Sequence, residues 1–155
     1  MILLQEDFSR IQEVCDKLSA ESNAKLVFLV DKNGQLIAAS GETSGMDTTS
    51  LATLAAGNIA ATGGLAKLIG EKEFSILFHE GERDNLHLSI VASRLILVVV
   101  FDNRSSLGLV RLRVKKTTQK LELITVDMDK RHEADSGNPL FTEITDADIE
   151  GLFKE

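Results

Sequence analysis

The residues that could carry out catalysis are few and poorly placed for it. His79, His87 and His132 have no metal-ligand spacing with one another or with the acidic residues. His79 and His87 fall in predicted strands, where ordinary packing is the simpler interpretation. The single cysteine, Cys15, lies on the apolar face of a predicted helix, which favours a buried structural thiol over a nucleophile. We therefore expect no active site, metal or cofactor.

The glycines of the chain do not form a phosphate-binding loop. Gly57, Gly63 and Gly64 are not followed by the Gly-Lys-Ser/Thr sequence of a P-loop. No Gly-x-Gly-x-x-Gly opens a helix after a strand. These glycines instead lie inside a predicted helix, so their purpose must be sought in packing.

Apolar periodicity predicts the elements that surround these residues. Apolar residues recur at helical spacing from Asp7, a possible cap, to about Ala20. Asn33-Gly34 between two apolar runs predicts a hairpin, because both residues accept positive φ. The predicted strands are Lys25–Asp31, Leu36–Ala39, Phe74–His79, Leu86–Ala92 and Leu95–Phe101.

The last strand and the helix after it complete an α-β-β-α-β-β-β-α order. Leu95–Phe101 is apolar throughout, which predicts a central strand buried on both faces. Ser106 to Lys130 alternates like a strand near Val110, but six turns of helical spacing favour a helix. Its expected core residues are Leu107, Val110, Val114, Leu121, Ile124 and Met128.

The helix Thr48–Ile69 has the most informative pattern, since one of its faces carries almost only small residues. At 100° per residue the sheet-facing stripe should contain Leu51, Leu54, Ala55, Thr62, Leu65 and Ile69. The opposite face holds Thr53, Ala56, Gly57, Ala60, Gly63, Gly64 and Lys67. Each glycine costs about 1 kcal/mol relative to alanine in a helix. A protein-contact surface explains that cost; a helix buried on both sides within its own domain is the alternative.

Composition bounds the class of protein. The chain has 155 residues, 43 % hydrophobic, and no apolar run of membrane-spanning length. The start Met1–Asp7 lacks the pattern of a signal peptide, and one cysteine forms no internal disulfide, so we expect a cytoplasmic protein. Of the net charge of −7, most comes from Glu133–Glu155, with seven acidic residues and one basic residue. This balance disfavours nucleic-acid binding.

The acidic end of the chain has the pattern of a partner-binding segment. Residues 133–138 are expected to be a flexible linker, which separates a domain at 1–132 from a tail at 133–155. Thr145 can cap a short amphipathic helix that would be marginal alone in water. The tail would bind another protein or dock on its own domain, where basic residues of the 106–130 helix are one candidate surface. The apolar anchors are Phe141, Ile144, Ile149, Leu152 and Phe153.

The element order, the hairpin and the small-residue helix resemble the Roadblock/dynein light chain family. The resemblance is strongest in Leu51–Asn58, Gly64–Glu71 and Val100–Val110, and it covers nearly the whole chain. Within the family it points to bacterial regulators of gliding and cell polarity.

This resemblance implies a Roadblock-type α/β fold, with a five-stranded antiparallel sheet between the second helix and the two others. It also implies a homodimer that pairs second helices and third strands, with interface residues Gly57, Phe74, Ile76 and Phe78. The two second helices would form a platform for a small Ras-like GTPase. The platform contacts would be Thr53, Ala56, Ala60, Gly64 and Lys67.

Two classes of function are open at this point. The protein would accelerate GTP hydrolysis by repositioning the residues of the GTPase, with the tail modulating the nucleotide state. Alternatively, its dimer would be a scaffold for polarity or trafficking proteins without effect on hydrolysis. Arg104, on a turn after the central strand, has the exposed position of an arginine finger, but a turn or cap role is favoured, and the family is not thought to insert one.

Overall fold

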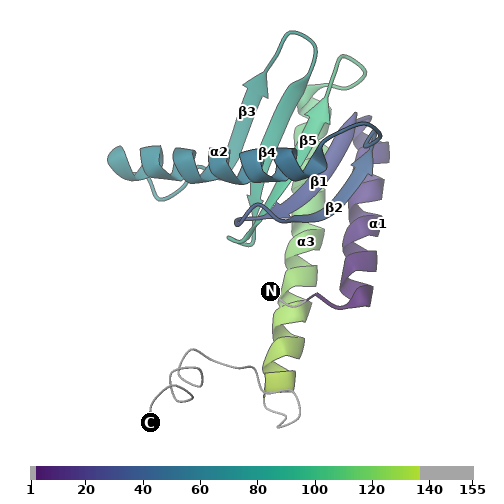
Figure 1. Cartoon of the computed structure of the whole chain (residues 1–155), viewed down its shortest axis with the longest axis vertical. Helices are drawn as coiled ribbons and strands as arrows, with labels where there is room; N and C mark the ends of the chain where they lie inside the picture. The colour runs from purple at the N-terminus through teal and green to yellow at the C-terminus, as the bar shows by residue number, and fades with distance from the viewer. Residues whose placement is uncertain (1–2, 137–155) are drawn as a thin grey trace.

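The computed structural model describes residues 3–136, and the structural statements below concern this part of the chain. Three helices and five strands follow one another in the predicted order (Figure 1). Their bounds are α1 Gln5–Ser22, β1 Leu26–Asp31, β2 Leu36–Gly41, α2 Thr48–Leu68, β3 Ile76–Glu80, β4 Asn85–Val91, β5 Leu95–Phe101 and α3 Leu107–Ser136.

The five strands form one antiparallel sheet in the order β2-β1-β5-β4-β3. All seven residues of β5 are buried, which confirms the prediction of a central strand covered on both faces. β3 is an edge strand, and its residues are mostly exposed. The sheet therefore has a buried centre and, within the described chain, two edge strands, of which β3 is more exposed than β2.

Alternate residues of the central strands enter two separate cores. On one face, α1 and α3 pack over residues such as Val27, Leu97 and Val99. On the other face, α2 packs over Phe28, Val98 and their neighbours. Figure 1 shows α2 crossing the sheet on the side opposite α1 and α3. The predicted Roadblock-type arrangement is confirmed.

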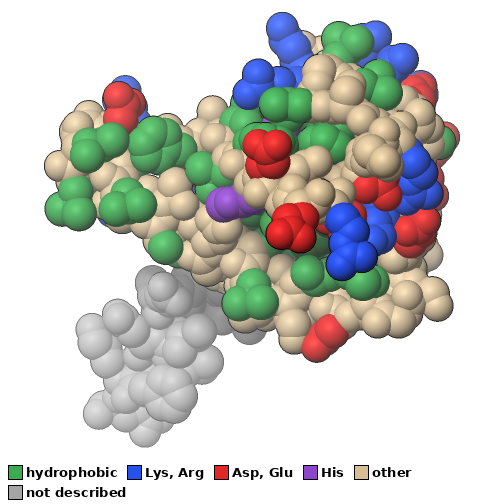
Figure 2. All heavy atoms as spheres, turned by 90° about the horizontal axis from the view of Figure 1, so that it is seen from above, with side chains coloured by type: hydrophobic (Ala, Val, Ile, Leu, Met, Phe, Trp, Pro, Cys, Tyr) green, Lys and Arg blue, Asp and Glu red, His purple; other side chains and the backbone are tan. Residues whose placement is uncertain are grey.

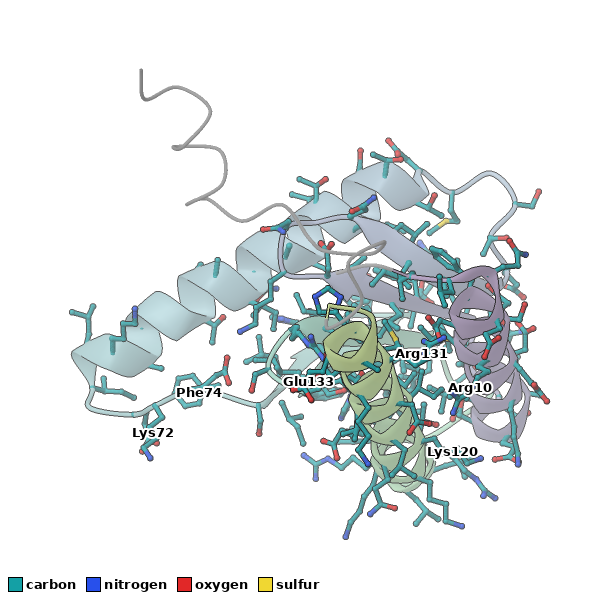
Figure 3. All side chains as sticks on the ribbon, turned by 90° about the horizontal axis from the view of Figure 1, so that it is seen from below. Arg10, Lys72, Phe74, Lys120, Arg131 and Glu133 are labelled. Atoms are coloured by element: carbon teal, nitrogen blue, oxygen red, sulfur yellow. The ribbon has the colours of Figure 1, made fainter. Side chains whose placement is uncertain are left out.

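The first helix begins two residues earlier than predicted, and Asp7 is not its cap. Leu4 occupies the N-cap position, and its backbone N–H donates to Asp7 Oδ2 at 3.0 Å. Asp7 is fully buried, and Arg131 of α3 donates to its other oxygen. Seen from below, Arg131 lies on the side of α3 that faces α1 (Figure 3). The ion pair thus joins the start of α1 to the end of α3.

The third helix is longer than the sequence pattern predicts. The helical interpretation is confirmed, and Val110, Val114, Leu121, Ile124 and Met128 are buried. The helix continues to Ser136, so residues 133–136 are helical and the prediction that a flexible linker begins at 133 is wrong. The remainder of the predicted tail, from 137 to 155, lies outside the described residues.

The β1–β2 hairpin forms, but with a different turn. Only Gly34 has positive φ, at 89°, whereas Asn33 does not. The Asp31 carboxylate accepts the backbone N–H groups of Asn33 and Gln35, which fixes a longer turn with a register shift in β1. Two consecutive positive φ values occur instead at Ala92 and Ser93, between β4 and β5. The predicted strand Leu86–Ala92 therefore ends one residue earlier, at Val91, because Ala92 belongs to the turn.

Candidate protein-interaction site

The second helix packs on the sheet through its small residues. Asp47 caps it by accepting the backbone N–H of Ser50 at 3.1 Å. The buried residues of α2 are Ala52, Ala55, Ala56, Ile59 and Ala66. Of the stripe expected to face the sheet, only Ala55 is buried, so that prediction is wrong. The sheet supplies bulky side chains such as Phe28 and Leu88, and alanines let the helix approach them closely.

The outer side of α2 is correspondingly rich in large apolar residues. Leu54 is 70 % exposed and Leu65 is 60 % exposed, although both were expected in the core. Leu68 and Ile69 are exposed at the end of the helix, which projects past β3 in Figure 1. Figure 2 shows hydrophobic side chains gathered on this projecting end. Such a patch on a monomer typically marks an interaction surface.

The five residues predicted to form the platform lie on α2, and four of them are exposed. Thr53, Ala60, Gly64 and Lys67 are exposed. Ala56 is only 7 % exposed and packs on the sheet, so it is not available to a partner. At 100° per residue the four exposed positions share one flank of the helix, and the exposed leucines share the other.

The glycines on α2 are not required by the packing of the chain itself. A Cβ atom built at Gly57 or Gly64 would meet nothing within 4 Å among atoms outside the local helix backbone. Both glycines are exposed. Their helix-destabilising effect is therefore not offset by any close approach within the described chain, which supports approach by another molecule.

The edge strand β3 lies beside α2 and also exposes apolar residues. Ile76 and Phe78, two of the predicted dimer contacts, are exposed on this strand. Phe74 is half-buried and precedes the strand, in the connection from α2 where Figure 3 labels it with Lys72. An edge with free main-chain groups and apolar side chains favours pairing with another strand.

The side chains with catalytic potential are held in structural roles. Burial raises the pKa of the Cys15 thiol to about 12, helped by the charge of Asp16, so the reactive thiolate is scarce at neutral pH. Arg104 donates from Nε to Asp102 at 3.0 Å and pairs through Nη1 with Glu42 at 3.3 Å. This places it in a turn network, as favoured above. Between residues 3 and 136 no cluster of His, Cys, Asp or Glu could hold a metal ion.

The basic residues at the start of α3 divide between two surfaces. Arg111 and Lys115 border a groove of about 570 Å³ between α3 and the β3–β4 edge. Lys116 and Lys120 line a smaller cleft between α3 and α1, with Lys17 opposite. The proximity of Lys17 lowers the pKa of Lys120. The charges therefore do not form a single docking face.

These features are those of a class of interaction domain. It has a sheet covered by helices on both faces, an exposed edge strand, and one helix whose outer side carries small and apolar residues. Residues 10–101 match the Roadblock/LC7 domain. The chain belongs to the Roadblock/LC7 family.

Within this family the chain is similar to MglB proteins of known structure. Myxococcus xanthus MglB is 59 % identical, with a TM-score of 0.78 over 82 % of this chain and 96 % of that chain. The gliding protein MglB of Thermus thermophilus is 34 % identical, with a TM-score of 0.76 and the same coverage. An MglB with a tetrameric arrangement is 33 % identical, with a TM-score of 0.77, again over 82 % and 96 %. None of the curated proteins compared matches the chain.

None of the helices within residues 3–136 is both long and apolar enough to cross a bilayer.

Proposed function

We propose that this protein is a cytoplasmic, homodimeric regulator of a small Ras-like GTPase of the MglA type. The observation that carries the proposal is the exposed side of α2, where glycines, alanine and leucines face outward without a packing reason in the chain. The similarity to MglB over most of the chain supports the same assignment.

The proposed dimer joins the β3 edges and the α2 helices of two copies. Pairing of the β3 strands satisfies the open main-chain groups and brings the Ile76 and Phe78 side chains of the two copies side by side. Leu54, Leu65 and Ile69 share the flank of α2 whose Asn58 contacts β3, so a partner would cover them too. Self-association of a relative is known from the MglB with a tetrameric arrangement.

The proposed platform for the GTPase is the other flank of the two α2 helices. Thr53, Ala60, Gly64 and Lys67 carry it, without Ala56. Small side chains allow the switch regions of a GTPase to approach the backbone closely. The protein would act by holding the GTPase's own residues in position. The segment 137–155 would add contacts that modulate the nucleotide state.

The proposal is tested by binding to the GTP-loaded GTPase. Ala60→Arg with Gly64→Arg places two guanidinium groups on adjacent turns of the platform, where they hold a partner off. We expect the variant to stay folded and dimeric and to lose binding, whereas Lys130→Glu, remote from α2, keeps it. Binding that survives in the double variant contradicts the platform.

A further inference from the structure

A groove between α3 and the β3–β4 edge is a second unoccupied surface, on the face of the sheet opposite α2. Ile76 pairs with Ser89, and Phe78 with His87, so these four side chains share the face that α3 partly covers. The remaining wall is one side of α3, from Arg111 through Val114 to Glu122. This side of α3, with Ile76, His87 and Ser89, borders a groove of about 570 Å³.

The floor of this groove contains polar atoms without partners in the described chain. His87 is 1 % exposed, and neither of its ring nitrogens makes a hydrogen bond to a described residue. Ser89 is 4 % exposed, and its hydroxyl is likewise without a partner there. Both side chains are covered even in the empty groove, so an occupant would rest on the more exposed residues around them, Ile76 and the side chains of α3.

The walls specify the chemistry of that occupant. Arg111 and Lys115 stand at the rim, against one acidic residue, Glu122. Ile76 and Val114 make the interior apolar. An amphipathic segment with a net negative charge is complementary to this combination.

The end of the chain has these properties and begins close enough to reach the groove. Residues 137–155 contain five acidic residues and one lysine, together with the five apolar anchors predicted from the sequence. From Ser136 back to Thr118 is about 27 Å along α3, a distance that roughly eight extended residues span. A helix over 145–155 would be about 17 Å long, which matches the stretch of α3 from Arg111 to Glu122.

Two exposed apolar residues of α3 lie between the groove and Ser136. Val126 is 46 % exposed and Leu123 is 66 % exposed on α3, toward Ser136 from the groove. Val126 lies about one turn beyond Glu122 on the same flank. Phe141 and Ile144 would pass these residues on the way, and Ile149, Leu152 and Phe153 would enter the groove.

We propose that residues 145–155 dock into the α3–β3–β4 groove of their own subunit, antiparallel to α3. The contact lies away from α2, so the segment occupies the groove without covering the proposed platform. The groove is then the resting site that this segment leaves when it contacts another protein. The proposal does not require the GTPase, and the protein alone tests it.

The sequence offers a direct probe, because it contains no tryptophan or tyrosine. In full-length Phe153→Trp the indole is the sole strong emitter. We expect blue-shifted emission and weak quenching by acrylamide relative to the same protein in denaturant. Arg111→Glu with Lys115→Glu should shift the emission to that of a solvent-exposed indole while circular dichroism is unchanged.

A matched control uses the same helix and the same change of charge. Lys116→Glu with Lys120→Glu alters the cleft toward α1 and should leave the blue shift in place. Solvent-like emission in the parent Phe153→Trp protein would overturn the proposal. A blue shift that persists in Arg111→Glu with Lys115→Glu would also overturn it. The same holds for a blue shift that is lost only in Lys116→Glu with Lys120→Glu. A blue shift that disappears on dilution would assign the groove to a second copy and overturn docking within one subunit.

Discussion

The side-chain nitrogen Nδ2 of Asn58 on α2 lies 3.1 Å from Nε2 of His79 on β3. The amide donates when Nε2 carries no proton, and Thr62 donates to the Asn58 backbone oxygen at 2.8 Å. This contact ties the outward helix to the open edge strand. Asn58 lies on the leucine flank of α2, the flank proposed to join the dimer, so a change at Asn58 or His79 is expected to affect the dimer edge.

Replacing the apolar residues of the edge should separate the dimer. Ile76→Lys with Phe78→Lys places two charges on the proposed strand-pairing edge, where desolvating them opposes association. Sedimentation should give the 16.9 kDa monomer mass for the variant and twice that mass for the parent. Leu112→Lys is a suitable control, since Leu112 and Ile76 are both 52 % exposed. A parent protein that is itself monomeric would refute the dimer.

Adding methyl groups to α2 should stabilise the helix and weaken association at the same time. Gly57→Ala and Gly64→Ala each favour the helix by about 1 kcal/mol, and no described atom obstructs the new Cβ. We expect higher resistance to urea together with weaker binding of the dimer partner or the GTPase. Gly63→Ala gives the same gain at a half-buried position away from the outer face, and should not affect association. Unchanged association in the first two variants would show that no partner needs these glycines.

Substitution by arginine should destabilise the protein at Ala56 but not at Ala60, one turn further along α2. Ala56→Arg forces a charge between α2 and the sheet and should lower the free energy of unfolding by about 3 kcal/mol or more. Ala60→Arg reaches water and should leave stability within about 0.5 kcal/mol. Thermal denaturation by circular dichroism measures both. Equal stability of the two variants would contradict the orientation of α2.

The Asp7–Arg131 pair should make stability depend on acid. Burial by itself would raise the pKa of Asp7, but the hydrogen bonds from Arg131 and Leu4, with the charges of Arg131 and Arg10, give a pKa below the usual value. The pair therefore stabilises the fold above the unfolded-state pKa of about 3.9, and this contribution is lost as pH falls through the lower folded-state value. Asp7→Asn should cost about 2 kcal/mol at pH 7.

Urea denaturation at several pH values distinguishes this pair from general acid denaturation. The difference in stability between the parent and Asp7→Asn should shrink as pH is lowered below about 4. Asp127→Asn serves as the control, because its ion pair with Arg10 is exposed and should contribute little at any pH. A constant difference between the parent and Asp7→Asn across this range would contradict the assigned role.

The sequence predicted the order and type of the elements well, because the apolar pattern of each strand reflects how deeply that strand is buried in the sheet. β5 is apolar throughout and lies at the centre of the sheet, as expected. Helical periodicity located α2 but assigned its faces wrongly, because that reasoning assumes that the large apolar residues of a helix face the core. Here Phe28, Leu88 and other sheet residues fill the space, so the helix contributes alanines, and Leu54 and Leu65 face outward. A surface that is completed by a second molecule cannot be told from a core by hydrophobicity alone.

Contacts between residues far apart in the chain could not be predicted from the sequence either. Nothing local to Asp7 indicates that Arg131 will pair with it 124 residues later. The two separate surfaces formed by Arg111 with Lys115 and by Lys116 with Lys120 follow from the position of α3 over the sheet. They require the tertiary structure.

The most direct test of the central claim is single-turnover GTP hydrolysis by the cognate Ras-like GTPase, with and without this protein. We predict an acceleration of roughly tenfold or more, equivalent to a barrier lowered by at least about 1.4 kcal/mol, and its loss in Ala60→Arg with Gly64→Arg. The protein alone should hydrolyse no GTP. Equal hydrolysis rates with and without the protein, in a mixture where the two demonstrably bind, would contradict the account and identify the dimer as a scaffold.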